Sequence, residues 1–456
     1  NASSRPSQLQ YRNSCSYVRL RAATIRYHKG MFYIVNTLDV QGRTYRYNFI
    51  LTSKDPAGQL ADAVSIKGAD GIDPSLYFDE EGRIWYCGNM IPEDLKYPTH
   101  KMIYLCELDR NTFQFIGRRH IIYDGNVDHS LFMEAPHIYH VQGMYYLMTA
   151  CGGTQTNHCV NICRSKSLFG PYEPCPRNPI VTNRGLRLIN DLGVAVTGHG
   201  DLVQTQEGEW YMLLLGIRPY EQEIDDYERY QPRKWIRTPD RNRNAQFNLG
   251  REVFMVPIAW DYDGWPLVDN HNGMVNLEER RPGLSYNRPP LHSRVDNFED
   301  ESLDMIWCMR RPVQTPFHDL TQRPGYLRME LLPVKLEDME TPAMLVRRQQ
   351  HYNFQAALAM EFEPLRDGEE AGLVLTQNER FSFLLVKEIH RGKPRISCYR
   401  VVNGTRELIG CSEIGSGRVY LFVEGSEGRY DFYCGSKERC CNRRSGKTNP
   451  LHIAFC

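Results

Sequence analysis

The feature that most constrains the fold is a hairpin pattern that recurs four times in the first half of the chain. Each copy has an apolar strand, a polar turn that ends in glycine and a second strand rich in aromatic residues, and the turn glycines are Gly30, Gly82, Gly143 and Gly208. Glycine accepts the positive φ angle of a tight hairpin turn. The glycines lie 52, 61 and 65 residues apart, a period that fits a four-stranded blade with its loops. The pattern predicts an all-β chain that begins with a β-propeller.

A change of pattern divides the chain in two. A further turn at Gly264 is followed by Pro266, which belongs at a sheet edge, so we expect it to join the outer strands of the fourth blade. The pattern then lapses into a stretch rich in proline and arginine. From Asp296 onward, short alternating strands predict a β-sandwich. We expect a propeller domain over residues 1–285 and a β-sandwich with an irregular tail over residues 286–456.

Charge and cysteine usage exclude several classes of partner. The 55 basic and 55 acidic residues cancel and no basic run occurs, so we expect no nucleic acid and no anionic membrane as a partner. No apolar stretch approaches the roughly 18 residues that span a bilayer. The 14 cysteines are scattered without the paired spacing of a zinc site, which favours free thiols in a reducing compartment such as the cytoplasm.

Three polar residues occupy the same register in successive hairpins. Asp73, Glu134 and His199 each lie nine residues before a turn glycine. Equivalent positions on inner strands face one another around a propeller axis, so we expect these side chains to meet. Taken singly, each could instead cap a turn or satisfy buried backbone. Two inward carboxylates suit glycoside hydrolysis, and the alternative is a hard cation such as calcium, with His199 among its ligands.

At these motifs the sequence resembles glycoside hydrolase family 43, in particular its β-xylosidase and α-L-arabinofuranosidase members. The matching segments are TIRYHKGMFY (24–33), GIDPSLYFD (71–79), EAPHIY (134–139), GHGDLV (198–203), LGRE (249–252), DGWP (263–266), RRQQHYNF (347–354) and EAGLVL (370–375). The resemblance implies a five-bladed propeller that hydrolyses with inversion and carries a C-terminal β-sandwich.

The resemblance also implies roles for individual residues. Glu134 would be the general acid, and Asp73 the carboxylate that orients it and tunes its pKa. Arg251 resembles the arginine that contacts the sugar, and His199 the axial histidine near which some members hold calcium at the propeller axis. No cofactor is required.

Two departures from the family pattern lead to further expectations. The family's general base is an aspartate of the first blade, upstream of the segment resembling residues 5–9, and this sequence does not include it. We therefore expect about four of the five blades, weakened hydrolysis, and an exposed sheet edge that favours a homo-oligomer. Arg21 stands where the family usually has an aromatic residue lining the sugar pocket, so we expect Arg21 to contact the substrate.

The predicted function is therefore cleavage of terminal xylose or arabinose from xylo- or arabino-oligosaccharides by an inverting acid–base mechanism. The alternative is a non-catalytic carbohydrate-binding protein that retains the sugar pocket. The sequence does not distinguish xylose from arabinose.

Overall fold

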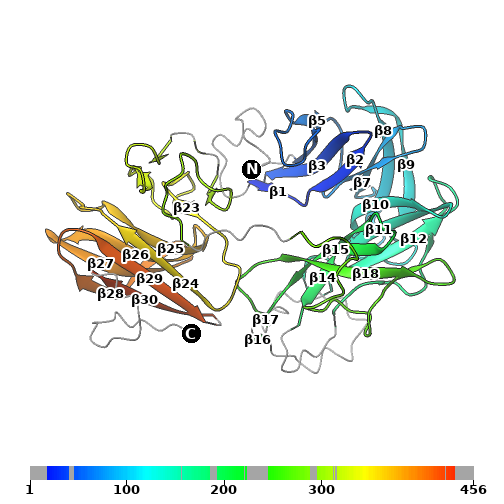
Figure 1. Ribbon diagram of the computed structural model, residues 1–456. Coiled ribbons are helices and arrows are strands. Elements are labelled where there is room, and N and C mark those ends of the chain that lie inside the picture. The colour runs from blue at the N-terminus through cyan, green and yellow to red at the C-terminus, as the bar shows by residue number, and fades with distance from the viewer. Residues whose placement is uncertain are drawn as a thin grey trace. The chain divides into compact units, whose positions relative to one another are not determined.

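The computed structural model divides into two units (Figure 1), with the division between residues 290 and 291. It describes residues 18–40, 46–155, 157–184, 193–219, 221–222, 245–287, 295–311, 313, 316–426 and 428–436. All elements found within these ranges are strands, and none of the ranges contains a helix that could span a membrane. The all-β prediction is confirmed.

The first unit is built from four antiparallel sheets that follow one another along the chain. The first sheet contains β1 (Val18–Leu20), β2 (Thr24–His28), β3 (Met31–Val40), β4 (Arg46–Ser53) and β5 (Val64–Ile66). The second contains β6 (Ser75–Phe78), β7 (Ile84–Met90), β8 (Met102–Leu108) and β9 (Phe115–Asp124). The third contains β10 (Glu134–Val141), β11 (Met144–Cys151), β12 (Cys159–Ser165) and β13 (Glu173–Pro174). The fourth contains β14 (Ala195–Gln204), β15 (Trp210–Ile217), β18 (Glu252–Trp260) and β19 (Pro266–Val268).

The repeated hairpins form as predicted. The turn glycines have φ angles of 82°, 76°, 77° and 87° at Gly30, Gly82, Gly143 and Gly208, a backbone region that disfavours residues with a Cβ atom. They join β2 to β3, β6 to β7, β10 to β11 and β14 to β15. The turn at Gly264 joins β18 to β19 at the outer side of the fourth sheet, which confirms that prediction as well.

The hydrophobic core of this unit lies between consecutive sheets, as a propeller requires. One cluster, with Val35 and Tyr86, lies between the first and second sheets, and another, with Trp85 and Leu147, lies between the second and third. A third cluster, which includes Met212, lies between the third and fourth sheets. A short pair, β16 (Glu221–Gln222) and β17 (Ala245–Gln246), lies outside these sheets.

The second unit contains two larger sheets packed face to face. One has β24 (Phe354–Met360), β29 (Val419–Ser426) and β30 (Arg429–Gly435), and the other has β25 (Glu370–Asn378), β26 (Phe381–His390), β27 (Lys393–Val402) and β28 (Thr405–Glu413). Their core includes Leu385, Ile396, Leu421 and Phe432, which are fully buried. Two small ribbons precede these sheets, β20 (Cys308–Met309) with β23 (Leu345–Val346), and β21 (His318–Asp319) with β22 (Arg328–Met329). This unit is the predicted β-sandwich.

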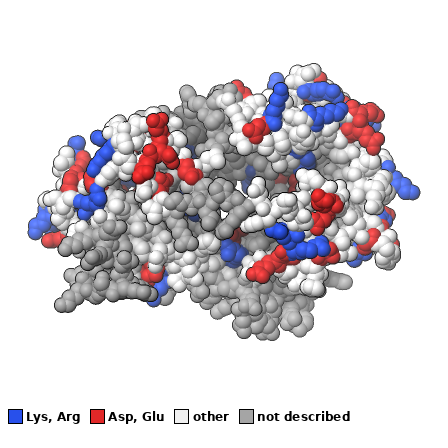
Figure 2. Space-filling model, viewed as in Figure 1, with Lys and Arg blue, Asp and Glu red and all other residues white. Residues whose placement is uncertain are grey.

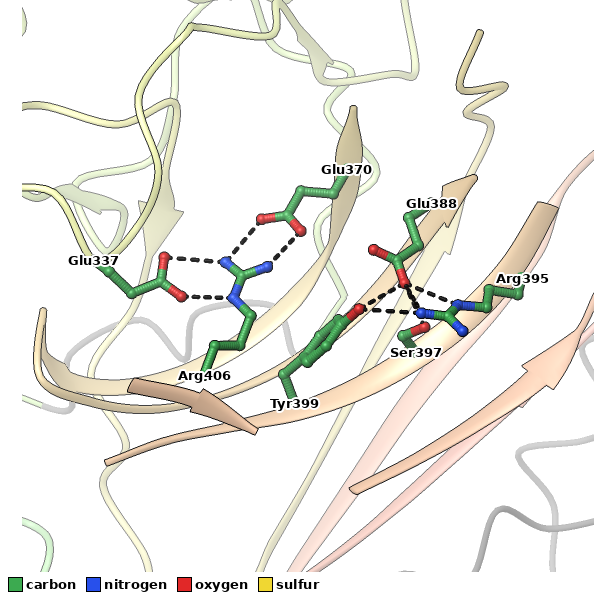
Figure 3. Close-up of polar contacts among 7 residues, drawn as sticks. All are labelled: Glu337, Glu370, Glu388, Arg395, Ser397, Tyr399 and Arg406. Atoms are coloured by element: carbon green, nitrogen blue, oxygen red, sulfur yellow. Dashed lines mark hydrogen bonds and ion pairs between the residues drawn. The ribbon is translucent and has the colours of Figure 1, made fainter. Parts of the chain in front are cut away.

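The opposite face of the β25–β28 sheet carries paired charges (Figure 3). Arg406 donates hydrogen bonds of 2.7–3.0 Å to both carboxylate oxygens of Glu337 and of Glu370. One oxygen of Glu388 accepts hydrogen bonds from Arg395, Ser397 and Tyr399 at 2.6–3.0 Å. Because Glu370 and Glu388 lie opposite each other on β25 and β26, where like charges repel, each has its own arginine.

The distribution of surface charges and the placement of the cysteines both follow the expectations from composition. Both signs are interspersed on the face drawn in Figure 2. Ten cysteines lie within the described ranges, and seven of them are buried among apolar side chains, as expected for cysteines that pack as small hydrophobes.

Candidate active site

Local backbone irregularities set the directions of the three residues that share a register. The pairing of β10 with β11 shifts between Glu134 and His137, and β14 shifts against β15 on both sides of Gly198. Asp73 and His199 have left-handed φ angles of 54° and 55°. Such bulges and left-handed residues redirect side chains and are maintained at functional sites. The irregularities therefore occur where the predicted site residues lie.

The structure brings the three side chains together. Nδ1 of His199 lies 4.0 Å from Oδ2 of Asp73. The negative charge of Glu134 acts on both Asp73 and His199. Residues from three successive sheets thus share one polar cluster, as the common register predicts.

Asp73 is held in an environment that favours its protonated form. Burial and the neighbouring charge of Glu134 raise the pKa of Asp73 to about 7, although Arg21, Lys101 and the backbone N–H of Ala22 oppose the shift. Only 8% of the residue is exposed. Asp73 can therefore gain or lose a proton near neutral pH.

Two histidines beside these carboxylates are neutral at neutral pH. Burial lowers the pKa of His199 and of His158 to about 4. The ring of His158 underlies the bulge before His199, because a Cβ atom on Gly198 would lie 2.5 Å from that ring. Nδ1 of His158 contacts the carbonyl oxygen of Val196 at 3.2 Å. Sequence reasoning did not find His158, which lies outside the repeated hairpin register.

The two predicted arginines are placed differently. The positive charge of Arg251 lowers the pKa of His199 and of His158, so Arg251 lies beside the histidines. Arg21 forms an ion pair with Asp39 on β3, and its charge also reaches Asp73. Contact of either arginine with a sugar remains a prediction.

A second polar cluster, also missed from the sequence, links three sheets. Arg26 on β2 donates two hydrogen bonds to Asp201 on β14, at 2.7 and 3.0 Å, and approaches Nδ1 of His137 on β10 at 2.7 Å. The hydroxyl of Tyr139 donates to Asp201 at 2.6 Å. Burial opposes ionisation of Asp201, but His137, Arg26 and Tyr139 lower its pKa to about 2. Asp201 is therefore a permanent carboxylate that ties the first sheet to the fourth.

The described side chains do not form a metal cage. Within the ranges that the structure describes, no group of three or more His, Cys, Asp or Glu side chains is arranged to hold a metal ion. His199 and Asp73 are two such groups, whereas calcium takes six to eight oxygen ligands. These residues do not fit calcium held by side chains alone, and no chemical step is assigned to a metal.

The family profile of "Glycosyl hydrolases family 43" matches residues 1–266 of the chain. The chain belongs to glycoside hydrolase family 43. A second profile, "Beta xylosidase C-terminal Concanavalin A-like domain", matches residues 295–449. Membership of family 43 makes the protein a glycosidase, as the resemblance implied.

Relatives and solved structures agree with this family 43 assignment. A xylosidase/arabinosidase of Butyrivibrio fibrisolvens is 32% identical, over 90% of this chain and 75% of that protein. A non-reducing end α-L-arabinofuranosidase of Bacteroides ovatus is also 32% identical, over 90% of this chain and 70% of that protein. The structure is similar to that of a xylan β-1,4-xylosidase from Bacillus halodurans, with a TM-score of 0.83 and 26% identity over 99% of this chain and 81% of that one. The β-propeller with a C-terminal β-sandwich is thus the family fold.

Proposed function

We propose that this family 43 glycosidase releases terminal xylose or arabinose from xylo- or arabino-oligosaccharides, with inversion at the anomeric carbon. The single observation that carries the proposal is the convergence of Asp73, Glu134 and His199 from three successive sheets. The relatives named above are a xylosidase/arabinosidase and an α-L-arabinofuranosidase, which supports a pentose as the sugar.

In this mechanism Glu134 is the general acid that protonates the leaving oxygen. Asp73 is assigned the role of the carboxylate that orients the acid. The charge of Glu134 acts on it, and it lies in a largely buried position beside His199.

Neutral His199 lies beside these carboxylates, and the charge of Arg251 acts on it. A neutral imidazole can hydrogen-bond a sugar hydroxyl as donor or acceptor, and a guanidinium donates to sugar oxygens without accepting. We assign both residues to holding the pentose while its bond to the leaving group lengthens.

An inverting reaction also requires a carboxylate base that activates water. By the family resemblance this base belongs to a segment that precedes the one like residues 5–9. A positioned acid–base group of this kind typically contributes about 10²–10⁴-fold.

The test is hydrolysis of 4-nitrophenyl β-xyloside and 4-nitrophenyl α-L-arabinofuranoside, with wild type and Glu134→Gln. We expect release of nitrophenol by the wild type, and a loss of about 10²–10⁴-fold on xylobiose in Glu134→Gln, where protonation of the leaving group matters most. Glu173→Gln, at an exposed ion pair with Arg164 on the same sheet, is the matched control and should behave as wild type.

Calorimetry with xylobiose distinguishes the alternative of a binding protein. Binding of the sugar by wild type without any turnover would favour a non-catalytic carbohydrate-binding role. If the protein neither bound nor hydrolysed any pentoside, the proposal would be contradicted.

A further inference from the structure

Lys101 is the cation in contact with the carboxylate assigned as the acid. It directly precedes β8, and its ammonium donates a hydrogen bond to Oε1 of Glu134 on β10. The two side chains are only 15% and 19% exposed. The pair therefore joins the second sheet to the third, in a place largely withdrawn from solvent.

Lys101 has a second polar contact, with Asn89. Its ammonium lies 3.4 Å from Oδ1 of Asn89 on β7. The amide of Asn89 is oriented for this contact because its Nδ2 donates to the carbonyl oxygen of Ile72 at 2.6 Å. Gly71 packs against the same asparagine so closely that a Cβ atom would lie 2.1 Å from the Asn89 carbonyl oxygen. The segment that leads to Asp73 and the lysine that contacts Glu134 thus share one support.

The chemistry of an ammonium group determines what this contact does. An ammonium has three donors and no acceptor, so the oxygen that it contacts remains an acceptor. If Oε1 of Glu134 is occupied in this way, the proton that Glu134 delivers is carried by Oε2. We propose that Lys101 is a positioning residue that fixes the Glu134 carboxyl group and reserves Oε2 for proton delivery, an inference that rests on the proposed function.

The charge balance of the cluster is consistent with this role. Asp73 and Glu134 contribute two negative charges when ionised, and Lys101 contributes one positive charge. His199 and His158 are neutral near pH 7 because burial lowers their pKa to about 4, and Arg251 and Arg21 are the remaining cations that act on these groups. The ammonium of Lys101 is in contact with Glu134, and its charge also acts on Asp73, so one cation serves both carboxylates.

Leaving-group dependence separates positioning from a purely structural ion pair. In Lys101→Met we expect kcat on xylobiose to fall about 10- to 100-fold with little change in KM, since a misplaced catalytic group costs factors of this size. A 2,4-dinitrophenyl pentoside, whose leaving group departs without protonation, should lose less than about threefold in the same variant. Lys101→Arg keeps a cationic donor and should recover most of the loss on xylobiose. Equal losses on both substrates, or none on either, would overturn the proposal.

A measurement without substrate makes the inference independent of the proposed function. A lysine ammonium that is immobilised by hydrogen bonds gives a persistent ¹⁵N-detected NMR signal. We expect such a signal for Lys101 in the wild type and its loss in Glu134→Ala, with Glu173→Ala as the control that retains it. A signal that persists in Glu134→Ala contradicts the pairing even if pentosides are hydrolysed. If the signal behaves as expected but no pentoside is cleaved, the proposed function fails and the pairing stands.

Discussion

The carboxylates near the propeller axis and those on the face of the β25–β28 sheet are both largely withdrawn from solvent, but their surroundings differ in kind. On the sandwich, Arg406 and Arg395 neutralise Glu337, Glu370 and Glu388 in direct contact (Figure 3). At the axis, Lys101 is in direct contact with Glu134, whereas the basic side chain that lies 4.0 Å from Asp73, among the described residues, is His199, which is neutral at neutral pH.

The electrostatic consequences are opposite. Burial opposes ionisation of Glu388, but hydrogen bonds from Ser397, Tyr399 and Arg395 lower its pKa below the ordinary value. Burial and a second carboxylate raise the pKa of Asp73 to about 7. The sandwich uses charge to hold strands and a loop together. The axis keeps charge incompletely compensated, an arrangement that costs stability and is typical of sites that move protons.

The largest effect should follow from Asp73→Asn, which keeps the shape of the side chain and removes its charge. We expect kcat to fall about 10²–10³-fold, because the acid loses the neighbouring carboxylate that orients it. The melting temperature at pH 8 should stay equal or rise, since a poorly compensated buried carboxylate is gone. Asp70→Asn, at a partly exposed ion pair with Arg119, is the control and should leave both properties unchanged. If Asp73→Asn were less stable than wild type and fully active, Asp73 would have a structural role like that of the paired carboxylates on the sandwich.

On the sandwich side, Arg406→Met should change stability and leave catalysis intact. Removing the arginine takes away the cation that is hydrogen-bonded to both Glu337 and Glu370, and Arg310 then remains as a cation that acts on Glu337. Breaking a buried pair typically costs about 3–5 kcal/mol, and because about a quarter of the Arg406 side chain is exposed, we expect about 2 kcal/mol by chemical denaturation. Lys393→Met, at an exposed pair with Glu413 in the same sheet, should change stability by less than about 0.5 kcal/mol. Loss of turnover per folded molecule in Arg406→Met would show that the two regions are not separate in role.

The smallest predicted effect is an opposite dependence of stability on pH. The pKa of Asp73 is raised on folding, so its contribution is fully present below about pH 4 and is lost as pH rises to about 7. The pKa of Glu388 is lowered on folding, so its contribution is present above about pH 4.5 and is lost as pH falls below that value.

The contribution of Asp73 to stability is measured by chemical denaturation of wild type and Asp73→Asn at pH 5 and pH 8. We expect the wild type to lose at least about 1.4 kcal/mol between these pH values relative to the variant, the free energy of one pKa unit. Glu388→Gln should reduce the loss of stability between pH 5 and pH 3. Parallel pH curves for wild type and Asp73→Asn would contradict the assignment of the raised pKa.

The sequence predicted those features that follow from counting residues within a hairpin. Asp73, Glu134 and His199 were found because each lies at the same distance from a turn glycine, and backbone register carries that distance into space. The propeller, the outer pair at Gly264 and the sandwich follow from the same alternation of strands and turns.

The residues that the sequence did not predict have no such common offset. Lys101 lies in a connection before β8, where a lysine is ordinarily solvated, and its contact with Glu134 arises only when the second and third sheets pack together. Arg26 and Asp201 are 175 residues apart, and each looks like an ordinary surface charge in sequence. Contacts between sheets depend on how loops and bulges direct side chains, which no single-strand pattern records.

The ion pair between Arg26 and Asp201 also bears on the order in which contacts form during folding. The arginine is synthesised long before its partner on β14, and the contact cannot form until both strands have been made. Long-range contacts of this kind are slow to form, so the surroundings of His137 and Asp201 are expected to be completed late in folding. A partly folded chain would carry Glu134 and Asp73 without the ion pair that joins the first sheet to the fourth.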